Sequence, residues 1–125
     1  MKEVISSKNA PAAIGPYSQA IKTGNMIFVS GQLPIDPATG EFVAGGIKEH
    51  TAQCFANIKA ILAEAGATTA NIVKTTVLLS DMSLFAEMNE VYAANFEGTF
   101  PARSAFAVKT LPKNAMIEIE VIAAI

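Results

Sequence analysis

The chain has 125 residues, of which 51% are hydrophobic and only 16% are charged, and its formal net charge is −2. This length fits a single domain, residues 1–125, with a core of its own. The absence of a basic run argues against nucleic-acid binding, which needs a basic patch to displace counterions from phosphate, and against binding to an anionic membrane surface.

So small a share of charged residues predicts that apolar area is hidden at a subunit interface. Cys54 is the only cysteine and cannot form an internal disulfide. Residues 1–15 contain Lys2, Glu3 and Lys8 and no apolar stretch, so we expect no signal peptide there. The longest apolar runs, about five residues, are far shorter than the roughly 18 that span a bilayer. These features predict a cytoplasmic location.

The first third of the chain predicts short strands and turns. Weak strands are expected at Lys2–Ser6 and Tyr17–Lys22, separated by a loop whose two prolines prevent a helix or a central strand. Thr23–Asn25 predicts a hairpin turn that leads into a short apolar strand, Met26–Ser30. Asp36–Gly40 is a second turn cluster.

Two segments predict helices. In the first, apolar or small residues trace one helical face, and Gly66 ends it; the face consists of Ile47, Thr51, Cys54, Phe55, Ile58 and Leu62. The second helix is expected to begin near Asp81 or Ser83, either of which is a suitable N-cap, and to end by Gly98 and Pro101. Its apolar stripe is Phe85, Met88, Tyr92 and Phe96.

Three further strands complete the pattern. Ile72–Ser80 is rich in β-branched residues, Ala102–Val108 follows the second helix, and Met116–Ile125 alternates apolar residues with Glu118 and Glu120. The order β-β-β-α-β-α-β-β predicts an α+β fold in which two helices cover one face of a mixed sheet. The other face needs a cover, which a homo-oligomer would supply.

Arg103 is the only arginine, and it stands at the start of a predicted strand. A guanidinium presents a fork of donors that matches a carboxylate, although a surface ion pair is an alternative role. Glu118 and Glu120 lie on a strand dominated by Ile and Val. A buried carboxylate there would have a raised pKa and serve as a general acid or base, whereas an exposed one would belong to a solvated face.

Weaker signals come from four other residues. Gly31, after Ser30 at a strand end, would let a ligand approach the backbone or would mark a bulge. Tyr17 would line a pocket or be an ordinary half-buried tyrosine. Asn89 lies near the apolar stripe of the second helix, and by itself it carries little information.

His50 and Cys54 share a predicted helical face, but a zinc site needs three or four ligands and no other His or Cys exists. Cys54 belongs to the apolar stripe, where a small buried hydrophobe is the better interpretation. Gly45-Gly46 has neither the Walker-type lysine nor the dinucleotide-binding spacing. From these residues we expect neither a metal nor a nucleotide cofactor.

Four long segments, spread over essentially the whole chain with matching spacing, resemble the RidA/YjgF family: Asn9–Gln19, Ser30–Pro34, Phe100–Ser104 and Ile117–Val121. The resemblance implies a chorismate-mutase-like α+β fold and a homotrimer whose sheets form a central barrel, with active sites in clefts between subunits. It also implies hydrolysis of 2-iminobutanoate and 2-iminopropanoate to 2-oxo acids and ammonia, without cofactor or metal.

The resemblance further implies roles for individual residues. Arg103 would bind the substrate carboxylate, and Glu118 would position or activate the attacking water. The backbones of Gly31 and Ala105 would point at the substrate or the water. The pocket would be shaped by Tyr17, Ser30 and Asn89. Many relatives carry a cysteine at the position of Ala105, so a function of that thiol would be missing here.

Other functions are compatible with the same residues. The main alternative is a regulatory or ligand-binding trimer that binds small carboxylates and acts through a partner, in purine regulation, translation inhibition or a chaperone-like role. A purely structural trimer would need neither Arg103 nor Glu118. A ribonuclease is disfavoured by the acidic balance and by the lack of a histidine pair.

Overall fold

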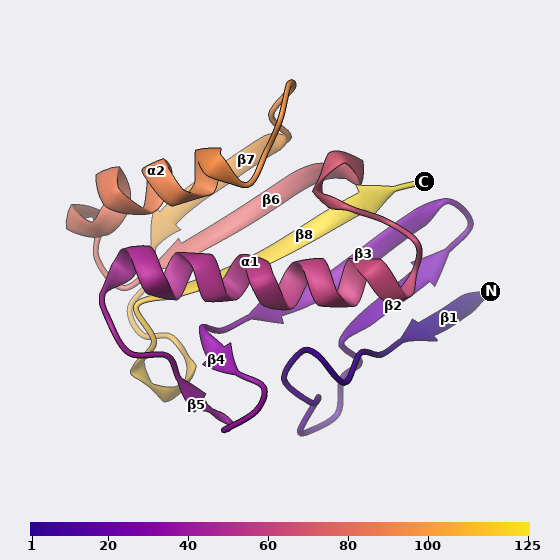
Figure 1. The fold of residues 1–125 in the computed structure, drawn as a ribbon, viewed down its shortest axis with the longest axis horizontal. Helices are drawn as coiled ribbons and strands as arrows, with labels where there is room; N and C mark the ends of the chain where they lie inside the picture. The colour runs from indigo at the N-terminus through magenta and orange to yellow at the C-terminus, as the bar shows by residue number, and fades with distance from the viewer.

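The computed structural model describes residues 1–125 and contains a six-stranded mixed sheet in the order β1-β2-β3-β8-β6-β7 (Figure 1). Only β6 and β7 are parallel to each other, and the other neighbours are antiparallel. The strands are β1 Lys2–Ile5, β2 Ala20–Thr23, β3 Met26–Gln32, β6 Ile72–Leu79, β7 Ala102–Ala107 and β8 Ile117–Ala124.

Two helices, α1 (Ile47–Glu64) and α2 (Phe85–Ala94), lie side by side over one face of the sheet, as Figure 1 shows. The Glu49 carboxylate accepts a 2.8 Å hydrogen bond from the Gly46 amide at the start of α1. Gly66, with a φ of 73°, follows the helix end, and the amide of Ala67 donates a hydrogen bond to the carbonyl of Leu62. The predicted layer arrangement and the predicted stop at Gly66 are therefore confirmed.

The core lies between these helices and the sheet. From β8 it receives Ile117, Ile119 and Val121, each exposed by 2% or less, and the predicted face of α1 is buried as well. Full burial of one such aliphatic side chain stabilises the fold by about 1.5–3 kcal/mol. The period of two on β8 and the 3.6-residue period on α1 thus specify the packing correctly.

Some boundaries differ from the sequence prediction. β2 begins at Ala20 rather than Tyr17, and the side chain of the preceding residue, Gln19, binds the backbone of an adjoining loop. The second helix was expected to begin near Asp81 or Ser83, but α2 begins at Phe85, and a 3-10 turn, Met82–Leu84, capped by Asp81, precedes it. Phe96 lies beyond the end of α2, packed against the core.

Sequence patterns did not predict a two-stranded ribbon, formed by β4 (Ile35–Asp36) and β5 (Glu41–Phe42). The turn between the two strands was predicted, and the Asp36 carboxylate accepts a hydrogen bond from the Ala38 amide there. Strands of two residues are too short for an alternation of apolar and polar residues to become visible. The ribbon lies next to α1, on the same side of the sheet (Figure 1).

The face of the sheet opposite the helices is uncovered. A row of paired apolar residues crosses four of its strands, at Val4, Ile21, Phe28 and Ile122. Val4 is 62% exposed and Phe28 is 43% exposed, and Phe106 of β7 is exposed to a similar degree. So much exposed apolar surface on one face is typical of an interaction surface. Neither helix combines the length and the apolarity that a membrane-spanning segment needs.

Candidate functional site

Arg103 lies near the start of β7, with its guanidinium under α2. Its Nη1 donates a 2.6 Å hydrogen bond to Oδ1 of Asn89, which comes from α2. The guanidinium carbon lies 4.7 Å from the ring centre of Tyr92 and 5.2 Å from that of Phe85. Such stacking on aromatic faces suits arginine, whose flat cation is weakly hydrated. One amide and two rings of α2 therefore fix the orientation of this side chain.

The guanidinium forms one wall of a pocket of about 520 Å³, which we call the arginine pocket; it is lined by Asn89, Tyr92, Ala93, Phe100, Pro101 and Arg103. The hydroxyl of Tyr92 is hydrogen-bonded to Thr75 of β6 at 2.7 Å, which anchors the ring. The rings of Tyr92, Phe96 and Phe100 continue from the core towards this pocket in edge or tilted contacts.

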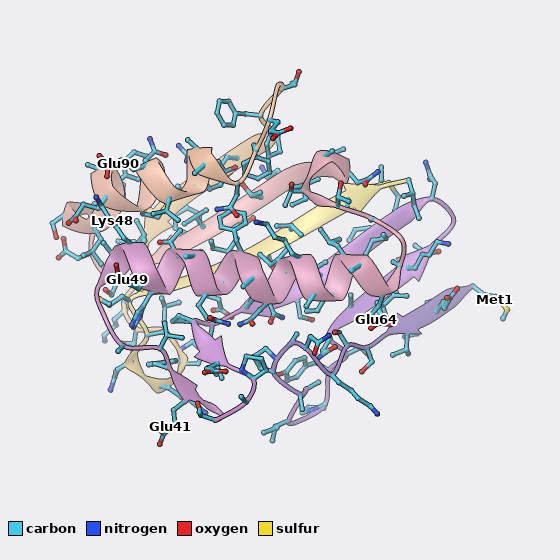
Figure 2. The ribbon with its side chains drawn as sticks, in the orientation of Figure 1. Met1, Glu41, Lys48, Glu49, Glu64 and Glu90 are labelled. Carbon is cyan, nitrogen blue, oxygen red and sulfur yellow. The ribbon has the colours of Figure 1, made fainter.

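Arg103 has no carboxylate partner in the chain. The only salt bridge joins Lys48 of α1 to Glu90 of α2, at 2.9 Å, where the two helices run together (Figure 2). Arg103 therefore does not form the surface ion pair that the sequence left open. A guanidinium carries five N–H donors, and the Asn89 contact occupies one of them. The free donors and the adjacent hollow suit a carboxylate ligand.

Glu118 of β8 lies in a different pocket, of about 680 Å³, together with Tyr17, Ser30 and Gly31; we call it the glutamate pocket. Burial, and secondarily the nearby charge of Glu120, raise the pKa of the Glu118 carboxyl above its ordinary value. A half-buried carboxylate with a raised pKa holds a proton more readily than a solvated one, as a general base requires. The solvated-face alternative therefore describes Glu120, which is exposed, better than Glu118.

Two buried amides position the walls of the glutamate pocket, and sequence reasoning missed both. Asn57 of α1 is fully buried and donates to the carbonyls of Leu33 and Ile35, at 3.1 and 2.9 Å. Gln19 binds the backbone of Ser7 through both ends of its amide and donates to Pro11 at 2.8 Å. A polar residue within an otherwise apolar helical face, as Asn57 is, is the signal that would have found the first.

Three other residues stand outside these pockets. Ala105 of β7 packs partly buried against the core and lines neither pocket. Cys54 is fully buried on the core face of α1, as predicted, and burial raises the pKa of its thiol. His50, 7% exposed, lies with Nε2 2.9 Å from the carbonyl oxygen of Val43. No three His, Cys, Asp or Glu side chains gather where they would hold a metal ion.

The two pockets lie on opposite faces of the sheet. Arg103 contacts α2, whereas Glu118 alternates with the buried residues of β8 and points to the open face. Of the predicted site residues, the structure joins Arg103 with Asn89 in one pocket; in the other it joins Tyr17, Ser30, Gly31 and Glu118. Within one chain the two proposed catalytic residues are therefore not brought together.

Comparisons with known proteins agree with this structure. Residues 7–125 match the family model described as Endoribonuclease L-PSP. A RutC family protein of Pyrococcus horikoshii is 58% identical over 123 residues, which are 98% of each chain. The 2-iminobutanoate/2-iminopropanoate deaminase of Mus musculus is 48% identical over 123 residues, 98% of this chain and 91% of that protein.

A solved structure shares the fold. The crystal structure of a protein of the conserved Rid family from Yersinia pestis superposes with a TM-score of 0.97 at 49% identity, over 100% of both chains. At this identity over the full length, the match shows that the two proteins belong to one family as well as sharing a fold. The names of these relatives indicate different activities, however, so the choice among them depends on the arginine pocket and the glutamate pocket of this chain.

Proposed function

This chain belongs to the RidA/YjgF family, and on that premise we propose that it is a 2-iminobutanoate/2-iminopropanoate deaminase, which hydrolyses 2-imino acids to 2-oxo acids and ammonia. The observation that carries the proposal is the Arg103 guanidinium, which is oriented by Asn89 beside a pocket and has no carboxylate partner in the chain. An oriented arginine of this kind suits a small 2-imino acid, whose carboxylate adjoins the reacting carbon.

The proposal includes assembly of the site from two copies of the chain. Because Arg103 and Glu118 occupy opposite faces of one sheet, a substrate can meet both only when the arginine pocket of one copy adjoins the glutamate pocket of the next. The uncovered apolar face supports such an association. We propose a homotrimer, in which a cyclic arrangement repeats the same composite site at each interface.

In this site the substrate carboxylate binds the free donors of Arg103. Glu118 of the neighbouring copy accepts a proton from a water molecule as the water oxygen attacks C2 of the imine. With the imine protonated on nitrogen, this addition gives a neutral carbinolamine and protonated Glu118. Glu118 then donates its proton to the amino nitrogen, the C2–N bond breaks to release ammonia, and Glu118 takes up the hydroxyl proton, which leaves a C2 carbonyl. An imine is already electrophilic, so alignment of the carboxylate, water and base supplies much of the rate. Each step uses side chains of the protein alone.

The ribonuclease activity in the name of the family model has little support in this chain. His50 is the only histidine, and it is buried against the carbonyl of Val43. The chain therefore lacks an exposed histidine pair for acid–base transfer to a ribose hydroxyl. The arginine pocket also offers a single arginine, too little for an extended phosphate backbone.

The proposal is tested by competition with semicarbazide. A dehydratase generates 2-iminobutanoate from threonine, and semicarbazone formation is followed with and without the protein. We expect the wild type to suppress trapping, and Arg103→Ala to lose at least about 100-fold in kcat/KM, because a charged double hydrogen bond is removed. Lys59→Ala, on the exposed side of α1, is the matched control for loss of one positive charge.

Unchanged trapping in the presence of folded, assembled wild-type protein would contradict the deaminase proposal. Full activity of Arg103→Ala would contradict the carboxylate-binding role instead. A regulator that binds carboxylates without hydrolysis would leave trapping unchanged yet bind a non-reactive 2-oxo acid in calorimetry, and the two functions are distinguished in this way.

A further inference from the structure

We infer that Gly31 is a positioning residue for Glu118: its missing side chain creates the seat in which the Glu118 carboxylate lies. The inference rests on the proposed function, because it concerns how the base of that reaction is held. It differs from the role in which the backbone of Gly31 faces the substrate, since it depends on the absence of a Cβ atom and predicts a different response to mutation.

The evidence is a close approach of the two residues. A Cβ placed on Gly31 would overlap Oε2 of Glu118 and would lie 2.8 Å from its Cδ and 3.1 Å from its Cγ. All three nearest atoms belong to that one side chain, and none belongs to a backbone. Any larger residue at position 31 must therefore displace the Glu118 carboxylate.

Backbone conformation does not explain the glycine. Gly31 is absent from the residues with positive φ, unlike Gly24 or Gly66, so alanine fits its backbone. Gly31→Ala should therefore disturb the Glu118 side chain and little else. This separation makes the position a clean probe, because the far end of a glutamate side chain moves at low cost while the fold persists.

A β-bulge brings the two residues together. Along β3 the pairing passes from Val29 to Gln32, while along β8 it passes only from Val121 to Ile119. The extra residue in β3 falls at Ser30 and Gly31, and a bulge of this kind re-aims the strand beside it. The hydroxyl of Ser30 donates to the Ser18 carbonyl at 2.6 Å, which fixes the bulge to the adjacent chain.

The seat also determines the surroundings of the carboxyl group. The titratable groups near it are Glu120 on the same strand, Tyr17 and Lys113 around the pocket, and the buried thiol of Cys54 on the helix side. Lys2 lines the adjoining hollow together with Glu120. If the Glu118 carboxyl leaves its seat for water, its desolvation decreases and the acid limb of the pH–rate profile moves to lower pH.

The experiment compares Gly31→Ala, Glu118→Asp and the double variant in the imine assay. For Gly31→Ala we expect kcat to fall about 10- to 100-fold because the base is displaced by about an ångström, while KM changes little because Arg103 holds the carboxylate. The acid limb should move to lower pH. Gly46→Ala is the matched control, because a Cβ there meets nothing closer than 4.0 Å.

Rescue separates this account from simple crowding of the substrate. Aspartate lacks the terminal oxygen that the added Cβ would overlap, so in the Glu118→Asp background the alanine should cost several-fold less in kcat than in the wild type. A further loss of 10-fold or more in that background would overturn the inference, as would a wild-type kcat and pH profile in Gly31→Ala. Full activity of Glu118→Gln would instead overturn the proposed role of Glu118 as base.

Stability supplies a second readout if Gly31→Ala folds poorly. The clash involves only the Glu118 side chain, so Gly31→Ala should be tolerated in a Glu118→Ala background, with a midpoint of thermal unfolding close to that of Glu118→Ala alone. Equal destabilisation by the alanine in both backgrounds would show that Glu118 is not what the Cβ meets, and would also overturn the inference.

Discussion

Glu118 shows how one side chain acquires a chemical role from its neighbours. It stands on a strand whose alternate residues form the core, and its carboxyl lies half-buried against Gly31. Burial and the charge of Glu120 disfavour the ionised form, which raises its pKa. The same environment that makes the carboxylate a better base also makes the protein sensitive to pH.

The pH dependence of activity follows from that shift. The deaminase needs ionised Glu118, so kcat/KM should fall as the pH decreases through a pKa above the ordinary value of 4.5. Glu120→Gln removes the repelling charge, so the acid limb should move to lower pH while the plateau is retained. Glu3→Gln, an exposed carboxyl on β1, is the control. An unchanged acid limb in Glu120→Gln would contradict this assignment.

The linked effect on stability has the opposite sign from that of a salt-bridged carboxylate. The folded-state pKa is raised, so protonated Glu118 is compatible with the fold and ionisation opposes it. Its contribution is fully present below the unfolded pKa and is lost as the pH rises through the folded pKa. Glu118→Gln should therefore raise the thermal midpoint at neutral pH, with a difference that disappears in acid; a constant difference would contradict the linkage.

At the scale of elements, α1 does more than cover the sheet. Through Asn57 it holds the segment from Leu33 to Ile35, which forms part of the glutamate pocket. Gln53, one turn earlier, donates to the side-chain Oδ1 of Asn57 at 2.9 Å and, over a longer distance of 3.3 Å, to the backbone carbonyl of Ile35. A buried amide with satisfied partners in this way connects the helix to the site.

Loss of the Asn57 amide should therefore affect both stability and activity. Asn57→Leu removes the donor that both the Leu33 and Ile35 carbonyls share and leaves the Gln53 amide without its Asn57 partner, and we expect a destabilisation of about 1–3 kcal/mol together with reduced kcat. Gln53→Ala should cost about 1 kcal/mol or less, because Asn57 still serves the Ile35 carbonyl. Urea unfolding at one fixed protomer concentration measures the loss of stability in each variant, and the imine assay measures kcat. Equal costs for the two variants would contradict the central role of Asn57.

The elements themselves were largely predictable, because their periods are strong. The alternation along β8 and the apolar face of α1 specify which residues are buried, and the structure confirms both. A bulge at Gly31 was one of two alternatives that the sequence left open, and the register of β3 with β8 confirms it; the amide contacts of Asn57 were not predicted. A bulge depends on register with a distant strand, and the Asn57 bonds span 22 and 24 residues of sequence. The sequence therefore marks the two positions but does not identify their partners.

The site was predicted as a set of residues and not as an arrangement. Alternation on β8 assigned Glu118 to the face opposite Ile117 and Ile119. No such alternation assigns Arg103, since β7 reads Ala-Arg-Ser-Ala-Phe-Ala and only two of its residues are even partly buried. The separation of Arg103 and Glu118 on opposite faces therefore became visible only in the structure.

At the scale of the whole molecule, one chain contains the arginine pocket and the glutamate pocket on opposite faces of its sheet, and the face that holds the glutamate pocket is uncovered. Phe106 of β7 stands in register with Leu78 and Glu118, so it shares the open face with the proposed base. A charge at this position would have to be buried if that face forms the interface between copies. The oligomeric state and the activity are thus expected to depend on the same surface.

Phe106→Glu should therefore dissociate the assembly and abolish imine hydrolysis together. Met82→Glu is the matched control, since Met82 is 46% exposed against 48% for Phe106 but lies in the 3-10 turn before α2. Light scattering coupled to size-exclusion chromatography measures the mass of each variant. If Phe106→Glu has the same mass as the wild type, the open face is not the interface.

The central claim, a site shared between two copies, is tested most directly by mixing inactive variants. Arg103→Ala and Glu118→Gln each lose activity alone, but unfolding and refolding them together produces mixed assemblies. With random assembly at equal amounts, about a quarter of the composite sites pair an intact Arg103 with an intact Glu118, and about a quarter of wild-type activity should return. If mixed assemblies form but are as inactive as their components, Arg103 and Glu118 do not act together in one site between copies.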